Sequence, residues 1–302
     1  MDGRDVSRRT ALVCGAAAVF AGAAAAQDKA LTAADVLARM RTSIGTEWRE
    51  GGVDRFIVGS ADMPVKGIAT TMMATFDALK AAVAQGLNLI ITHEPTYWSH
   101  QDRLEQLQDD PLYKRKLTYA QAHDLIVYHF HDHWHAKRPV DGINEGMARK
   151  MGWTGFRDAA NSRQYNIPAT SLSGLARAFQ TRLKNRTLRV IGDPALAVNK
   201  VVASWGNCSS FPGIPYLDSE ADVLVIGEAQ DWDLIAYAQD LAAAGRKKAL
   251  VVLGHVLSEQ WGMEFCADWL RPLMPETKVK FLPLIEPYWN PHLPVFEINT
   301  RI

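Results

Sequence analysis

The chain has 302 residues, 48% of them hydrophobic, and it carries 33 basic and 33 acidic side chains. A sequence of this length and composition can bury a substantial core, which excludes an intrinsically disordered protein. The balanced charge lacks the excess of Lys and Arg on which binding to nucleic acids or anionic membranes depends. We therefore expect one large or two ordinary folded domains that act on a small-molecule substrate.

The first 26 residues have the pattern of a secretory signal peptide. Arg8 and Arg9 precede an apolar stretch rich in Ala and Gly, and three alanines at 24–26 then provide small residues for cleavage. Adjacent arginines before a weakly apolar segment indicate the twin-arginine route, so we expect a periplasmic or otherwise exported protein. The alternatives are a cytoplasmic tail and an uncleaved anchor, although a membrane-spanning helix needs about 20 apolar residues.

Strand and helix patterns alternate along the rest of the chain. Thr32 and Asp35 form a predicted capping box, which opens a helix to about Ser43. Further helices are predicted near 76–85, 113–122, 144–151, 171–184 and 234–244, and a loop rich in helix breakers near 207–213. Strands are predicted near 67–72, 87–92, 125–130, 188–190, 201–204, 223–226, 249–253, 279–284 and 295–298. This rhythm predicts an α/β protein with parallel or mixed sheets flanked by helices.

Two cysteines, Cys208 and Cys266, remain after the signal segment. In an oxidising compartment they could form a disulfide, but cysteines so far apart in sequence are more often separate buried thiols. The sequence has no Cys-x-x-Cys spacing, which argues against a structural zinc site built from thiolates.

Histidines and carboxylates follow two of the predicted strands in the first half of the chain. His93 and Glu94 end the apolar run at 87–92, and Pro95 restricts the backbone of Glu94 to extended angles. Histidines then occupy every second position of the segment HFHDHWH at 129–135. In an extended strand these four side chains would lie on one face, about 7 Å apart, so only some of them could bind the same metal ion.

A third group follows the apolar run at 249–253. His255 and Glu259 are four residues apart, so they share one face if a helix begins after Gly254. Ligands bind outside the carboxyl ends of the strands in an open parallel sheet, and we therefore expect the three groups to converge. Imidazole and carboxylate ligands without thiolate suit zinc, iron, manganese, cobalt or nickel, and more than four candidate ligands indicate two ions.

Four segments resemble the Nif-three-like (NGG-one-interacting factor three) family of dinuclear metal proteins, which includes GTP cyclohydrolase type-two homologues. The resemblance covers most of the chain after the signal segment and rests on GLNLIITHEPTYW, HDHWHAKRPVDGINEGMARKMGW, ADVLVIGEAQDWDLIAYAQD and VVLGHVLSEQWGME. It implies metal ligation for residues in three of these segments and a supporting position beside the site for Glu228. The ligands it implies are His93, His131, His255 and Glu259.

Two positions depart from the family pattern. Glu94 stands where the family has a second histidine, and His135 stands where it has an aspartate that is expected to bridge the ions. The exchange keeps the number and charge of the ligands but leaves Glu94 and Glu259 as candidates for the bridging carboxylate. The complete set of predicted metal ligands is His93, Glu94, His131, His135, His255 and Glu259.

The resemblance also implies two α/β lobes, the second inserted in the middle of the chain, and a homo-oligomer in the form of a toroidal hexamer. We expect a metal-binding lobe at 27–155 and 216–302 and an inner lobe at 156–215. Two divalent ions, zinc, iron or manganese, would make the protein a hydrolase of a phosphoester, nucleotide or amide, with Glu228 or His133 as proton shuttle. The alternative is a non-catalytic metal-binding, metal-delivery or scaffold protein, which the extra imidazoles at 129–135 favour.

Overall fold

A computed structural model describes residues 30–100, 103–288 and 291, and the described residues from Leu31 onward form one compact unit. The predicted signal peptide at 1–26 and the predicted strand at 295–298 lie outside the described residues. None of the helices in the described ranges is both long enough and apolar enough to cross a bilayer.

Helices and strands alternate along most of the chain. The helices are α1 (Ala33–Ser43), α2 (Phe76–Ala84), α3 (Pro111–Ala122), α4 (Asp132–Ala136), α5 (Gly142–Met151), α6 (Leu172–Leu183), α7 (Ser210–Asp218), α8 (Ala236–Ala243) and α9 (His255–Leu270), with short helical turns η1 (Glu105–Leu107), η2 (Thr154–Phe156), η3 (Asp231–Ile235) and η4 (Arg271–Leu273). The strands are β1 (Arg55–Val58), β2 (Ile68–Met73), β3 (Leu89–Glu94), β4 (Ile126–His129), β5 (Gln164–Ser171), β6 (Arg189–Ile191), β7 (Ala197–Asn207), β8 (Val223–Glu228), β9 (Ala249–Val252) and β10 (Val279–Phe281).

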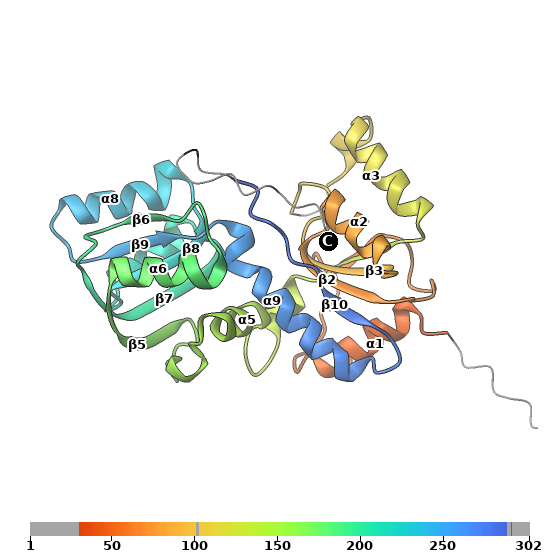
Figure 1. The fold of residues 1–302 in the computed structure, drawn as a ribbon, viewed down its shortest axis with the longest axis horizontal. Coiled ribbons are helices and arrows are strands. Elements are labelled where there is room, and N and C mark those ends of the chain that lie inside the picture. The colour runs from red at the N-terminus through yellow and green to blue at the C-terminus, as the bar shows by residue number, and fades with distance from the viewer. Residues whose placement is uncertain (1–29, 101–102, 289–290, 292–302) are drawn as a thin grey trace, which may run out of the picture. The chain divides into compact units, whose positions relative to one another are not determined.

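The first sheet has the strand order β1-β4-β3-β2-β10 (Figure 1). Only β1 runs antiparallel to its neighbour. Successive side chains of β3 enter different cores: Ile90 packs with residues of α2 and α3, whereas Leu89 and Ile91 pack in a core shared with α1 and α9. Because both faces of β3 are covered, its ionisable residues are confined to its carboxyl end, at His93 and Glu94.

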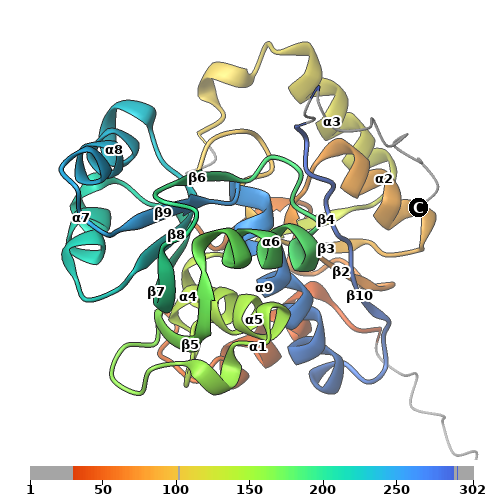
Figure 2. The same ribbon diagram turned by 60° about the vertical axis from the view of Figure 1, so that its left-hand side comes forward.

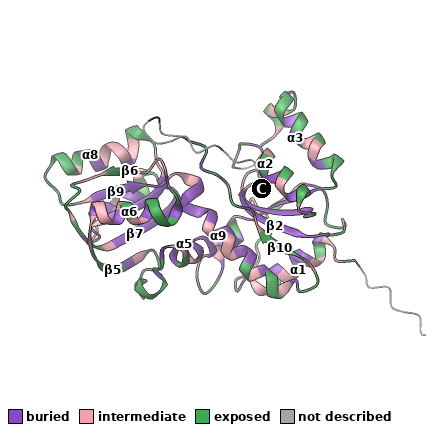
Figure 3. Cartoon of the chain, viewed as in Figure 1, coloured by how far each residue is buried: buried purple, intermediate pink, exposed green. Residues whose placement is uncertain are grey.

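The second sheet has the order β5-β7-β8-β9-β6, with parallel central strands and antiparallel edge strands. Residues of α7 and α8, such as Leu217 and Ala238, pack on one face, and Leu175 and Phe179 of α6 pack on the other (Figure 2). The central strands are buried in both sheets (Figure 3). The predicted α/β class, with mixed sheets flanked by helices, is confirmed, and the predicted lobe boundaries stay a prediction.

Helix α9 joins the two sheets. It packs against β2 and β10 of the first sheet and against β7 and β8 of the second (Figure 1). It also packs closely on α5, where Gly146 meets Gly262. A Cβ atom at either glycine would collide with the backbone of the opposite helix, so both positions need glycine. The amino end of α9, which carries His255, is thereby fixed near the carboxyl ends of strands from both sheets.

Candidate metal centre

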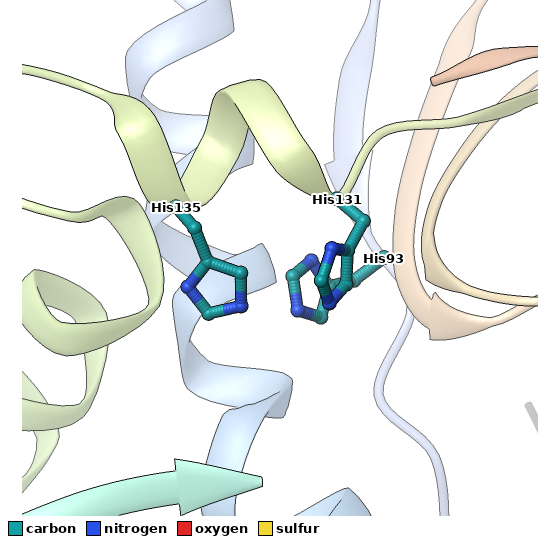
Figure 4. A group of neighbouring side chains, drawn as sticks. All are labelled: His93, His131 and His135. Carbon is teal, nitrogen blue, oxygen red and sulfur yellow. The ribbon is translucent and has the colours of Figure 1, made fainter. Parts of the chain in front are cut away.

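Three histidines from β3 and the α4 region point toward one another (Figure 4). His93 lies near the end of β3, His131 is the N-cap residue of α4, and His135 lies in the same helical turn. Their ring centroids are 4.6 to 4.9 Å apart, and each ring offers a nitrogen within 4.8 Å of the others. The structure therefore brings together three of the predicted metal ligands.

Segment 129–135 is not an extended strand, so its four histidines do not share one strand face. Strand β4 ends at His129, and α4 is helical from Asp132. His131 and His135, four residues apart, consequently share one side of a helical turn, where both reach His93. The ring of His129 does not join these three rings, because its Nε2 atom lies 3.0 Å from the backbone oxygen of His93.

The buried carboxylate of Asp54 causes this helical turn. It accepts the backbone N–H groups of residues 131, 132 and 133 at 2.7, 2.8 and 3.0 Å, which satisfies donors that a helix start leaves unpaired. It also lies 2.6 Å from Nδ1 of His133, whose Nε2 atom accepts the N–H of Arg49 at 2.9 Å. Both ring nitrogens of His133 are thus engaged away from the three histidines, which leaves Glu228 as the better placed of the two predicted proton shuttles.

Each of the three clustered rings has an oxygen acceptor beside its Nδ1 atom. The acceptors are the Phe130 carbonyl for His93 at 3.4 Å, Asp132 for His131 at 2.9 Å and Asp141 for His135 at 2.8 Å. When Nδ1–H donates to such an acceptor, the lone pair lies on Nε2, which is the arrangement found in metal-binding histidines. Nε2 of His93 is fully buried and has no hydrogen-bond partner within the described residues.

Carboxylates and a fourth imidazole complete the cluster. Oε2 of Glu259 lies 3.6 Å from Nε2 of His93 and 3.1 Å from Nε2 of His255, and Oε1 of Glu94 lies 3.4 Å from the same His255 atom. On the other side of that ring, Nδ1 of His255 lies 3.0 Å from Oε1 of Glu228. All six predicted ligands therefore meet in one place, with Glu228 beside them.

The surroundings of the cluster favour the charged form of His255 and the neutral form of His93. Burial opposes the charged form of His255, but hydrogen bonds with Glu228, Glu259 and Glu94 outweigh it and raise its pKa to about 12. Burial lowers the pKa of His93 well below its ordinary value, and the neighbouring histidines add to the effect. His93 is thus held neutral, with a lone pair available on a buried nitrogen.

Comparison with known proteins identifies the family of the chain. Residues 35–286 match the family described as Duf34/NIF3 (NGG1p interacting factor 3). The chain belongs to this family. A relative from Chlamydia pneumoniae named GTP cyclohydrolase 1 type 2 homolog is 23% identical over 256 residues, which cover 81% of this chain and 95% of the relative. A protein of the same name from Neisseria meningitidis serogroup B is 25% identical over 206 residues, or 67% and 77% of the two chains.

Solved structures show the same fold. Staphylococcus aureus hypothetical protein SA1388 superposes with a TM-score of 0.69 at 15% identity, over 86% of this chain and 99% of that one. Reduced HcgD from Methanocaldococcus jannaschii superposes with a TM-score of 0.60 at 16% identity, over 84% and 98%. The family match over residues 35–286 confirms the family resemblance inferred from the sequence motifs.

The site of this NIF3-family chain contains residues that the sequence did not single out. Asp54 contacts the ring of His133, and Asp141 contacts the ring of His135. His100 lies 3.7 Å from Glu94. Gly206 has a φ of +75°, and a Cβ atom there would collide with a carboxylate oxygen of Glu259. Asp141 had a detectable signal, because it precedes a predicted helix as an N-cap residue does, whereas His100 and Gly206 had none.

The donor set fits a divalent metal ion. Imidazole nitrogens and carboxylate oxygens converge without a thiolate, which suits zinc, iron or manganese. The unpaired Nε2 atom of His93 is a second sign, because a buried polar atom without a partner costs free energy that a bound ion would recover. The NIF3-family chain thus has a His/Glu cluster with the chemistry to bind metal.

Proposed function

We propose that this NIF3-family protein is a divalent-metal-dependent hydrolase of a small anionic molecule. The observation that carries the proposal is the buried, unpaired Nε2 atom of His93, which faces the carboxylate of Glu259 at 3.6 Å. The residues that would hold the metal are His93, Glu94, His131, His135, His255 and Glu259. Six ligands exceed the four that one tetrahedral ion uses, which supports a site for two ions.

The accessibility of the cluster favours an enzyme over a closed structural site. His93 and Glu259 are buried, but the side chains of His131 and His255 are 20% and 26% exposed. A catalytic metal site keeps a position open to substrate, whereas a structural site is closed by side chains. Divalent ions bound in such an open site supply Lewis-acid polarisation of a substrate oxygen and activation of water.

Glu228 has a position suited to proton transfer at the rim of the cluster. Its side chain is 47% exposed, and its Oε1 atom lies 3.0 Å from Nδ1 of His255. This contact holds the proton of His255 on Nδ1 and turns Nε2 toward Glu94 and Glu259. The proposed roles of Glu228 are therefore to orient His255 and to exchange protons with solvent.

A niche beside the cluster supports an anionic substrate. It is lined by one ligand, His135, and by five neighbours: Asp141, Asn144, Ser162, Arg163 and Trp205. The guanidinium of Arg163, an exposed residue, contacts the hydroxyl of Ser204 at 3.3 Å, and its charge contributes to the lowered pKa of Asp141. A guanidinium beside a metal site suits phosphate or carboxylate groups, which favours phosphoesters and nucleotides over neutral amides.

The test compares two Glu→Gln variants on the same helix. Glu259→Gln alters a proposed ligand, whereas Glu264→Gln lies about one turn further along α9, outside the cluster. Metal content is measured on protein purified without added metal, and hydrolysis is measured on a panel of phosphoesters and nucleotides with and without chelator. We expect Glu259→Gln to lose both metal and turnover and Glu264→Gln to keep both.

Two other outcomes would contradict the proposal in different ways. Metal that is retained by Glu259→Gln at the wild-type level would show that the cluster is not the metal site. If Glu259→Gln loses metal as expected but the wild-type protein hydrolyses no substrate in the panel, the non-catalytic metal-binding or metal-delivery alternative is favoured.

A further inference from the structure

We propose that His100 completes an outer metal site together with Glu94 and His131, distinct from the buried site around His93 and Glu259. The proposal rests on the proposed function, because it assigns the second of the two ions to named residues. His100 lies in the loop after β3, and its side chain is 53% exposed.

The two carboxylate oxygens of Glu94 face different groups. Oε1 lies 3.4 Å from Nε2 of His255 and 3.9 Å from Nε2 of His131. Oε2 lies 3.7 Å from Nδ1 of His100. A carboxylate whose two oxygens face different imidazoles has the placement of a bridging ligand. We therefore assign a bridging role to Glu94.

Two sets of donor atoms meet at Glu94. The buried set is His93, Glu94 and Glu259, and the outer set is Glu94, His100 and His131; within each set the donor atoms lie within 4.8 Å of one another. Ligands about 2.1 Å from a tetrahedral zinc ion lie roughly 3.4 Å from one another. The contacts of Glu94 with His100 and His131, at 3.7 and 3.9 Å, are close to this spacing and longer than ordinary hydrogen bonds.

Two other polar side chains close to the outer set are already engaged. Asp132 is engaged, because one of its oxygens lies 2.9 Å from Nδ1 of His131 and the other accepts the N–H of Val53 at 3.2 Å. Nε2 of His129 lies 3.0 Å from the backbone oxygen of His93. The rings of His100 and His131, by contrast, stand nearly perpendicular with centroids 4.8 Å apart and have nitrogens available beside Glu94.

The difference in burial predicts two unequal affinities. The buried set is held by packed side chains, so its members lose little conformational freedom on binding. His100 is exposed and must be ordered when an ion binds, which costs conformational entropy. We therefore infer a tight inner ion and a weaker, more readily exchanged outer ion.

The experiment titrates Zn²⁺ into full-length protein that has been stripped with chelator. A competing chromophoric chelator reports both stoichiometry and affinity, and Mn²⁺ loading followed by electron paramagnetic resonance reports whether two ions lie close enough to couple. The test variant is His100→Ala. The matched control is His123→Ala, an exposed histidine at the C-cap of α3 that belongs to none of the metal-binding groups.

We expect two ions of unequal affinity in the wild-type protein and in His123→Ala. His100→Ala should weaken the second ion by about ten-fold or more, abolish the coupled Mn²⁺ signal and leave the first ion unchanged. Two ions with wild-type affinities in His100→Ala would overturn the outer site, as would a single ion in the wild-type protein. Because Glu259→Gln tests the buried site independently, the outer site can fail while the proposed hydrolase stands.

Discussion

Asp141 uses its two carboxylate oxygens for two different purposes. Oδ1 accepts the N–H groups of Ile143 and Asn144 and so caps the amino end of α5. Oδ2 lies 2.8 Å from Nδ1 of His135 and so orients a proposed metal ligand. Substitution by asparagine separates these purposes, because asparagine caps a helix as well as aspartate does but cannot offer two acceptor oxygens.

The two contacts predict effects of different kinds. In Asp141→Asn an amide N–H can face Nδ1 of His135, which favours the tautomer that carries its proton on Nε2, where the metal should bind. Loss of such an orienting carboxylate typically costs 10- to 100-fold in metal affinity, or about 1.4 to 2.7 kcal/mol. Asp141→Ala should show this loss and in addition lose the cap, at about 1 kcal/mol of unfolding free energy.

Chelator competition and thermal unfolding distinguish the two effects. We expect metal-free Asp141→Asn to unfold near the wild-type temperature while its zinc affinity falls by 10- to 100-fold. Asp110→Asn is the matched control, because Asp110 caps α3 through the N–H of Tyr113, away from the cluster. Wild-type zinc affinity in Asp141→Asn would refute the assignment of His135 as a ligand oriented by Asp141.

Two further predictions concern the packing around the cluster and the cysteines. Gly206→Ala should lose metal, because a Cβ atom there would collide with the carboxylate of Glu259 and the positive φ would cost about 1–2 kcal/mol more. The control is Gly155→Ala, which has open space around the new methyl group and should bind metal normally. Equal metal content in the two variants would contradict the prediction. Cys208 and Cys266 are free and buried, and burial raises the pKa of both thiols, so neither should react with a thiol reagent at pH 8 in a folded Cys14→Ser chain. Both should react in denaturant, and labelling of the folded protein would show that one of them is accessible.

Local sequence patterns were sufficient to locate most of the cluster. The apolar run of β3 ends at His93 and Glu94, and the spacing of His255 and Glu259 placed both on one face of a helix, as α9 confirms. The sequence did not show that the three groups follow strands of different sheets: β3 and β4 belong to the first sheet, whereas β9 pairs with β8 in the second. Hydrophobic periodicity reports how each segment is buried but not which sheet it joins.

The sequence by itself determined the α/β rhythm and the residue types of the candidate metal centre, because both depend on short-range patterns of apolar, imidazole and carboxylate side chains. The tertiary structure alone decided which histidines meet. Asp54, 77 residues before His131, caps α4 and so turns His131 and His135 toward His93 while it draws His133 away. Likewise, only the course of the loop after β3 brings His100 back to Glu94. Such contacts depend on the packing of distant segments, which local periodicity does not encode.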